Sequence, residues 1–145
     1  MELDQYSVIT SSDGTSFEFF SEGPRGVIKK VVLYQTIEPG LVNLMFGDWN
    51  DKRQKVDDNN RSDNGDRDKV LATVGLTILD FLMRYPDSSI FAMGSTPVRT
   101  RIYQMQIAHN LKQINELFVI YGISDNQPEL FKVGKNYDAF LLTRK

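Results

Sequence analysis

Apolar residues in the first third of the chain cluster in the way that strands do. Residues 15–37 hold two apolar runs joined by a Gly-Pro-Arg-Gly turn at 23–26, where proline presets φ and the glycines tolerate positive φ. The second run is rich in β-branched and aromatic side chains, which strands favour. A Glu-Pro-Gly turn at 38–40 precedes a third apolar run at 41–49. We therefore expect three strands paired as an antiparallel meander.

A polar segment and a helix are predicted next. Residues 50–68 contain one aliphatic residue, Val56, and predict a solvated loop that is longer than a simple connection. Apolar residues recur at helical spacing over residues 66–86, and Asp66 and Asp68 stand near the start, where acidic groups complement the helix dipole. The expected buried stripe comprises Leu71, Val74, Ile78, Phe81 and Leu82, with Leu76 and Leu79 beside it.

A short strand and a second helix follow. Residues 88–93 form an apolar run that ends at Gly94. Thr96 and Pro97 are typical of an N-cap and of a first helical residue, so we expect a helix that continues to about Leu117. Its expected buried stripe comprises Val98, Ile102, Met105, Leu111, Ile114 and Phe118.

Two closing strands, at 118–124 and 137–145, complete the order βββ-α-β-α-ββ. This order predicts an α+β fold in which two main helices pack on a mainly antiparallel sheet. A length of 145 residues suits one domain with its own core, and no repeat or linker divides the chain. We expect a single globular domain over residues 1–145.

Composition narrows the classes of function. The net charge of −2 argues against a general nucleic-acid coat, although a local basic patch remains compatible with it. The absence of cysteine excludes disulfides, thiolate nucleophiles and cysteine-based zinc sites. No apolar run approaches the roughly 20 residues of a membrane span, and the acidic N-terminus is unlike a signal peptide. We expect a cytoplasmic protein with no membrane partner, no cofactor and no bound metal.

Four segments of the chain resemble a family of small bacterial proteins of unknown function. They read "FEFFSEGPRGVIKK", "SDNGDRDKVLATV", "GSTPVRTRIYQ" and "YDAFLLTRK", and the third is the most specific. The resemblance covers nearly the whole chain and supports one complete domain, but it implies no activity, substrate or catalytic residue. The order of strands and helices is also similar to the ribonuclease-H-like fold, by analogy only, and a fold does not fix a function.

The junction between the predicted strand at 88–93 and the second helix is the candidate site. Free backbone N–H groups at a helix N-terminus, together with the positive end of the dipole, attract anions. Arg99 and Arg101 stand in the first turns, where each cation costs ~0.3–1 kcal/mol unless a negative group lies near it. The candidate ligand-binding residues are Gly94, Ser95, Thr96, Arg99, Arg101 and Tyr103, with the Arg25 and Lys29 turn expected nearby.

Two interpretations of the arginines stay open. In the first, they bind a phosphate-bearing group through their planar guanidinium forks. In the second, they form salt bridges within the protein and have no further role. The candidate acids for such salt bridges are Asp48, Asp51, Asp66 and Glu22.

Other constellations in the sequence are weaker. An EF-hand alignment that starts at Asn60 places Leu71 where the bidentate glutamate must stand, so the calcium motif fails. Asp48 and Asp51 remain candidates for a magnesium-dependent phosphoesterase or nuclease site. The only histidine, His109, excludes His-cluster zinc sites and favours a packing or surface role in mid-helix.

Aromatic and basic residues in the predicted strands offer a second route to nucleic acids. Trp49, Phe46 and Tyr34 are candidate stacking platforms for bases, although strand aromatics more often belong to the core. Lys29 and Lys30, with Arg25, form a small basic patch that is more typical of a solvated sheet edge.

Three functional hypotheses follow from the sequence. The first is a domain that binds a phosphate-bearing small molecule, a nucleotide or a nucleic acid at Gly94–Arg101. The second is a protein-interaction module, as a homodimer or with an operon partner of the toxin–antitoxin or defence type. The third is the metal-dependent enzyme, and the sequence does not decide whether the protein is an enzyme at all.

Overall fold

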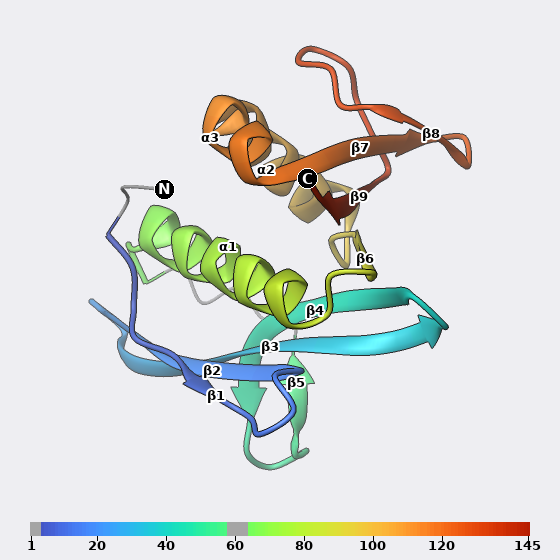
Figure 1. Cartoon of the computed structure of the whole chain (residues 1–145). Coiled ribbons are helices and arrows are strands. Elements are labelled where there is room, and N and C mark those ends of the chain that lie inside the picture. Colours follow the sequence, from blue (N-terminus) through green and yellow to red (C-terminus); the bar gives the residue numbers. More distant parts are fainter. Residues whose placement is uncertain (1–3, 58–63) are drawn as a thin grey trace. The chain divides into compact units, whose positions relative to one another are not determined.

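The long elements expected from the sequence are present in the computed structural model, which describes residues 4–57 and 64–145. The helices are α1 (Arg67–Arg84), α2 (Pro97–His109) and α3 (Leu111–Leu117). The strands are β1 (Ile9–Thr10), β2 (Ser16–Gly23), β3 (Gly26–Glu38), β4 (Leu41–Asn50), β5 (Lys55–Asp57), β6 (Ser89–Ala92), β7 (Phe118–Ser124), β8 (Gln127–Leu130) and β9 (Ala139–Arg144) (Figure 1).

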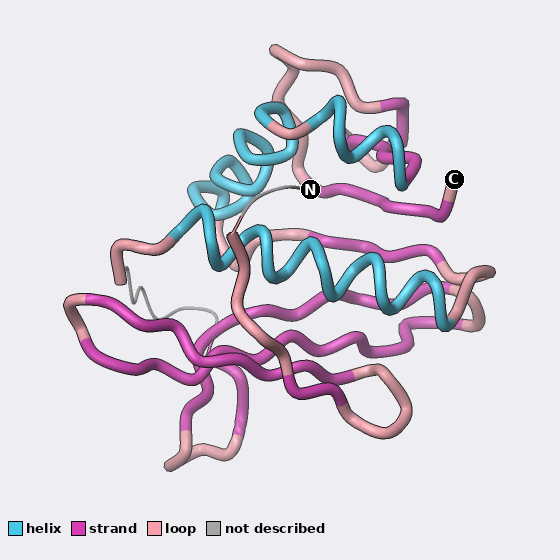
Figure 2. Tube along the Cα trace, turned by 60° about the vertical axis from the view of Figure 1, so that its left-hand side comes forward, coloured by secondary structure: helices cyan, strands magenta, loops and turns pink. Residues whose placement is uncertain are grey.

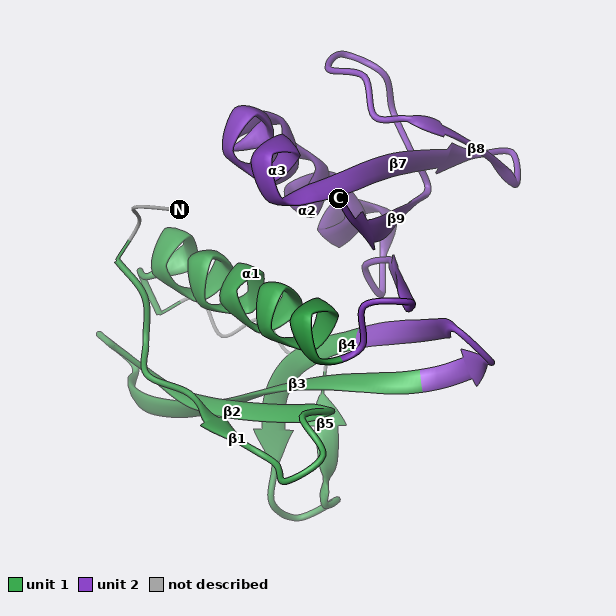
Figure 3. Cartoon of the chain, viewed as in Figure 1, with its two compact units in different colours: residues 1–35, 45–84 green, residues 36–44, 85–145 purple. Residues whose placement is uncertain are grey.

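The strands hydrogen-bond in the order β1-β2-β3-β4-β6-β9-β7-β8, and β5 pairs with β4. The pair β4–β6 is parallel. The pairs β1–β2, β2–β3, β4–β5, β6–β9, β7–β8 and β7–β9 are antiparallel. The fold is therefore α+β with a mostly antiparallel mixed sheet, as expected. The chain divides into two compact units, residues 1–35 with 45–84 and residues 36–44 with 85–145 (Figure 3). The expectation of a single globular domain stays a prediction.

The first unit is a helix on a sheet. The β2–β3 hairpin has the register that the turn at 23–26 predicts, with Gly23 opposite Gly26. Phe17 and Phe19 point from β2 into the core, and Phe17 packs edge-on against Tyr34 of β3. Figure 2 shows the long helix α1 (cyan) running along these strands (magenta).

The buried face of α1 differs from the expected stripe. Phe81 and Leu82 are buried as predicted, but Leu71 and Ile78 are only half-buried. Thr73 and Thr77 are fully buried instead. Their burial is satisfied because each hydroxyl bonds a carbonyl of its own helix, that of Lys69 for Thr73 and that of Val74 for Thr77, and each also meets a partner outside the helix.

Tyr34 is that outside partner for Thr77. The two side-chain oxygens lie 2.9 Å apart in a buried setting, and the tyrosine ring stacks on Phe81 with centroids 4.3 Å apart. Burial raises the pKa of the Tyr34 hydroxyl well above its usual value. The tyrosine therefore stays neutral and acts as a hydrogen-bonded part of the core.

The second unit is a sheet with two short helices. Strand β6 runs parallel to residues 41–44 of β4, and β9, β7 and β8 follow as antiparallel neighbours. Its core is built from alternating positions of these strands. Its large buried apolar side chains on these strands are Ile90, Phe118, Ile120, Phe140 and Leu142.

The predicted second helix is interrupted at Asn110, which separates α2 from α3. The Asn110 side chain donates to the Gln106 carbonyl at 2.9 Å and the Asn110 backbone N–H donates to the same carbonyl at 3.1 Å, so the side chain and the backbone share this acceptor at the end of α2. The expected stripe is wrong in part, because Val98 and Met105 are 54% and 63% exposed. Phe118 is buried, but as the first residue of β7.

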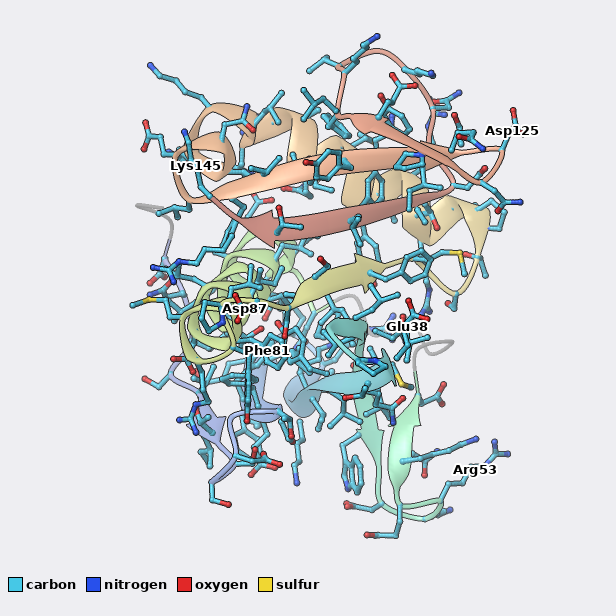
Figure 4. The ribbon with its side chains drawn as sticks, turned by 45° about the vertical axis from the view of Figure 1, so that its right-hand side comes forward. Glu38, Arg53, Phe81, Asp87, Asp125 and Lys145 are labelled. Atoms are coloured by element: carbon cyan, nitrogen blue, oxygen red, sulfur yellow. The ribbon has the colours of Figure 1, made fainter. Side chains whose placement is uncertain are left out.

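Three short strands, β1, β5 and β8, were not expected, and β1 pairs with β2. Strand β5 lies inside the predicted 50–68 loop and pairs with the end of β4. Of the rest of that loop, residues 58–63, which include Asn60 of the calcium alignment, lie outside the described residues. Strand β8 forms a hairpin with β7, and the turn between them consists of Asp125 and Asn126. Asp125 is labelled in Figure 4. Both turn residues have positive φ, which is the type I′ pattern of a two-residue hairpin.

The Tyr34–Thr77 contact predicts an asymmetry between two substitutions. Tyr34→Phe removes one hydrogen bond and keeps the ring stack, and we expect it to lower the free energy of unfolding by about 1 kcal/mol. Thr77→Val leaves the tyrosine hydroxyl buried without its partner, and we expect a larger loss of about 1–3 kcal/mol. Urea unfolding of both variants measures the difference; equal losses would contradict this role for the hydroxyl pair.

Candidate anion-binding site

The site begins where β6 gives way to α2, and Gly94 shapes this junction. The Gly94 N–H donates to the Thr100 hydroxyl at 3.0 Å. A Cβ atom at Gly94 would lie 2.4 Å from the backbone nitrogen of Thr100, so only glycine allows the first turn of α2 to pack this closely. The strand end and the helix start are thereby held together.

Thr96 is the N-cap that the sequence predicts. Its extended backbone precedes Pro97 at the first helical position, and its hydroxyl accepts the Arg99 N–H at 3.2 Å. The Thr96 hydroxyl is therefore committed to capping. Ser95 and Pro97 beside it are exposed.

The two arginines lie on different sides of α2, because two residues along a helix correspond to a rotation of about 200°. Arg101 is exposed, and its Nη1 donates to the Asn136 side-chain oxygen at 3.4 Å. Arg99 is half-buried on the side that packs on Gly94, with Tyr103 one turn further along. The structure thus brings Arg101 together with the loop before β9 and leaves Arg99 apart from it.

Gln104 fastens this loop to α2. Its side-chain amide donates to the Lys135 carbonyl at 2.5 Å, and its carbonyl oxygen accepts the Tyr137 N–H at 3.0 Å. Since both bonds go to backbone atoms of the loop, they position the loop independently of the identity of its side chains. We call Arg101, Gln104, Lys132, Lys135 and Asn136 the α2–loop surface.

The charge of the α2–loop surface is positive. Three of its residues are cations, and the acid that contacts it is Glu129 of β8, which pairs with Lys135 and lies 3.5 Å from Lys132. The hydrogen bond between Lys135 and Glu129 raises the pKa of the lysine and lowers the pKa of the carboxyl. Every residue of the second unit is described, and none of its carboxylates forms an ion pair with Arg99 or Arg101.

Sequence reasoning missed Lys132 and Lys135. They lie about thirty positions beyond the arginines, and the contacts of Gln104 and Arg101 with the loop bring them alongside α2. One signal was available: residues 88–115 contain no aspartate or glutamate in a chain with 19 of them. That run includes all of α2, so its exposed face carries no acid to neutralise Arg101.

The other candidate functional residues from the sequence lie in the first unit, except His109 at the end of α2. Asp48 is buried and accepts a hydrogen bond from Lys30 at 2.5 Å, and Asp51 accepts one from Trp49 Nε1 at 2.8 Å. Tyr34 is a core residue. Each of these side chains therefore has a structural role.

Several further predicted residues are placed as follows. Asp66 accepts hydrogen bonds from Tyr6 and Ser21. Phe46 stacks on Phe19, and His109 is exposed at the end of α2. Arg25 and Lys29 lie in the first unit, so the α2–loop surface is built from second-unit residues alone.

Within residues 4–57 and 64–145, no group of three or more His, Cys, Asp or Glu side chains is arranged to hold a metal ion. No described helix combines the length and the apolar character needed to cross a membrane.

The chain is an α+β protein with a glycine-shaped strand-to-helix junction and a positively charged surface beside it. Residues 2–145 match the family of unknown function DUF6934, and the chain belongs to that family. No curated protein and no solved structure matches it.

The Glu129 pair gives a pH-dependent prediction. Because Lys135 and Lys132 stabilise the carboxylate, its folded-state pKa is below the ordinary value of 4.5, and its contribution to stability is lost as the pH falls through that lowered pKa. We expect Lys135→Met to raise the pKa of Glu129 toward its ordinary value. Carbon-detected NMR titration measures this, with Lys112→Met as the control that leaves it unchanged. An unmoved pKa in Lys135→Met would contradict the pairing.

Proposed function

We propose that the protein binds a phosphate-bearing ligand at the α2–loop surface, with the Gly94–Thr96 junction beside it. The observation that supports this proposal is the charge of the surface. Lys132 and Lys135 share one carboxylate, that of Glu129, and Arg101 contacts the neutral Asn136 of the same loop, in a chain that is acidic as a whole. A concentration of cations on one surface favours an anion.

The chemistry of the side chains favours phosphate over a single carboxylate. An arginine fork and two flexible ammonium groups match a group with several oxygens and more than one negative charge. Arg101 has a neutral partner, the Asn136 amide oxygen, whose contact at 3.4 Å is long. Replacing that contact with a charge-assisted bond to a phosphate oxygen would strengthen the interaction of the guanidinium group.

The proposal assigns a smaller role to two residues that the sequence favoured. Thr96 caps α2 with its hydroxyl, so it supports the site by fixing the helix start. Arg99 lies on the side of α2 that faces Gly94 and adds positive potential without sharing the surface of Arg101. Asp48, a candidate metal ligand of the nuclease hypothesis, is neutralised by Lys30 in a buried pair, which argues against a metal ion at this carboxylate.

A binding titration tests the proposal with probes of increasing charge. We expect pyrophosphate, ATP and a single-stranded oligonucleotide to raise the melting temperature of the protein and to lose affinity as salt rises. Arg101→Gln and Lys135→Gln should each weaken binding, by about tenfold if one charge-assisted contact of ~1.4 kcal/mol is lost. Calorimetry and thermal shifts provide the two readouts.

Two further variants distinguish binding at the α2–loop surface from nonspecific electrostatic attraction to the whole protein. Glu129→Gln removes the competing carboxylate and should strengthen binding. Lys112→Gln removes an exposed cation from α3 and should leave affinity unchanged. The proposal fails if none of the three probes binds, or if the loss in Lys112→Gln equals the loss in Arg101→Gln.

A further inference from the structure

The N-terminal segment of the first unit is anchored at Tyr6. Residues 4–8 form neither helix nor strand, and three of these five residues are exposed. Figure 1 shows the segment (blue) passing the N-terminal end of α1 on its way to β1. The Tyr6 backbone N–H donates to the hydroxyl of Thr73, a fully buried residue of α1, at 2.9 Å. We call residues 4–8 the N-terminal strap.

The Tyr6 hydroxyl has both an acceptor and a donor. It donates to Asp66 Oδ2 at 2.6 Å and accepts the Glu22 N–H at 3.0 Å. The hydroxyl of Ser21, a fully buried residue of β2, donates to the same carboxylate oxygen at 2.5 Å and fixes its position. Burial and the hydrogen bond to Asp66 raise the pKa of Tyr6, so the phenol stays neutral. A phenyl ring without the hydroxyl leaves both contacts unmade, so this arrangement selects a phenol.

The Tyr6 ring has partners of its own. It stacks on the Phe19 ring with centroids 5.7 Å apart, and the Lys69 ammonium group lies 4.2 Å from its centre. Lys69 also forms an ion pair at 3.5 Å with Asp4, two positions before the tyrosine in the strap. An aromatic surface, a cation and a paired hydroxyl together recognise every part of a tyrosine side chain.

The residues around Tyr6 form a complete set of contacts for a phenol, and we call them the tyrosine site. They are Phe19, Ser21, Glu22, Asp66, Lys69 and Thr73. All six lie outside the strap and within the first unit. The inference below therefore does not rest on the proposed anion site, whose residues belong to the second unit.

We propose that the tyrosine site binds a tyrosine side chain of a partner protein, and that the N-terminal strap occupies the site in cis as a built-in competitor. The partner segment is extended and carries an acid two positions before its tyrosine, because the strap that fills the site has this pattern in Asp4 and Tyr6. The tyrosine must be unmodified, since a phosphate on its oxygen would meet the carboxylate of Asp66.

The strap is suited to exchange with such a segment. It lies at the end of the chain and is largely exposed, and segments of this kind open at low cost in free energy. The pairing of Ile9 and Thr10 with β2 tethers it beside the site. A short tether gives the strap an effective concentration on the order of millimolar. The site is thus closed to weak ligands and open to a partner that binds more tightly than the strap.

Calorimetric titration of the full chain with a blocked peptide of the strap sequence, "DQYSV", tests the proposal. Tyr6→Gly removes the competitor, and we expect this variant to bind the peptide at least about tenfold more tightly than the wild-type chain. Tyr6→Phe keeps the ring and should fall between the two, and it provides the comparison with wild type if Tyr6→Gly does not fold. Equal affinities of the wild-type chain and the variants, or no binding to any of them, overturn the proposal.

Changes to the peptide and to the site test the recognition itself. A peptide with phenylalanine in place of tyrosine should bind Tyr6→Gly at least about tenfold more weakly, and the phosphotyrosine peptide should not bind. Adding Asp66→Asn, which still caps the helix, should reduce the preference for tyrosine. Adding Asp68→Asn, an exposed acid of α1, should preserve it. Equal binding of the two unmodified peptides overturns the proposal. A wild-type dimer that Tyr6→Gly dissociates also overturns it, because the occupant is then the strap of a second copy.

Discussion

Buried polar atoms must find hydrogen-bond partners, and this constraint sets the position of α1 in the first unit. The face of the helix that meets the sheet carries two threonines, so apolar packing alone does not define its register. Thr77 is held by Tyr34, and Thr73 accepts the Tyr6 N–H at 2.9 Å. Shifting the helix by one residue would break both contacts. Among the buried side-chain polar atoms of the described residues, only Gln113 Oε1 lacks a partner.

The long elements were predictable because their signals are local. The turn at 23–26 and the apolar runs beside it define the β2–β3 hairpin, and Thr96 with Pro97 defines the start of α2. Other features depend on partners distant in sequence. Nothing in the sequence near Thr77 indicates that its hydroxyl forms a hydrogen bond with a tyrosine 43 residues away. The break falls at Asn110, where a side chain and the backbone share the Gln106 carbonyl, and the spacing of apolar residues does not indicate it.

The candidate site shows the same division. The junction at Gly94 and the cap at Thr96 follow from the order of residues, and both are present. Arg99 and Arg101 looked like a pair because they are close in sequence, but helical rotation separates them. The partner that Arg101 does have comes from a loop fixed by Gln104. The proximity of the two arginines in sequence did not predict a shared site. The absence of acidic residues from 88 to 115 did indicate an unneutralised cation on α2.

One residue of the polar network also bears on how the protein ages. Asn64 precedes Gly65, the pair most prone to lose ammonia through attack of the following backbone nitrogen on the side-chain amide. In the folded chain that amide is fully buried, accepts the Arg25 N–H at 2.7 Å and donates to the Gly26 carbonyl at 2.9 Å. Holding it in place keeps it from the cyclic geometry that the reaction needs. Deamidation of Asn64 therefore requires local unfolding around the β2–β3 turn, and its rate reports how often this turn opens.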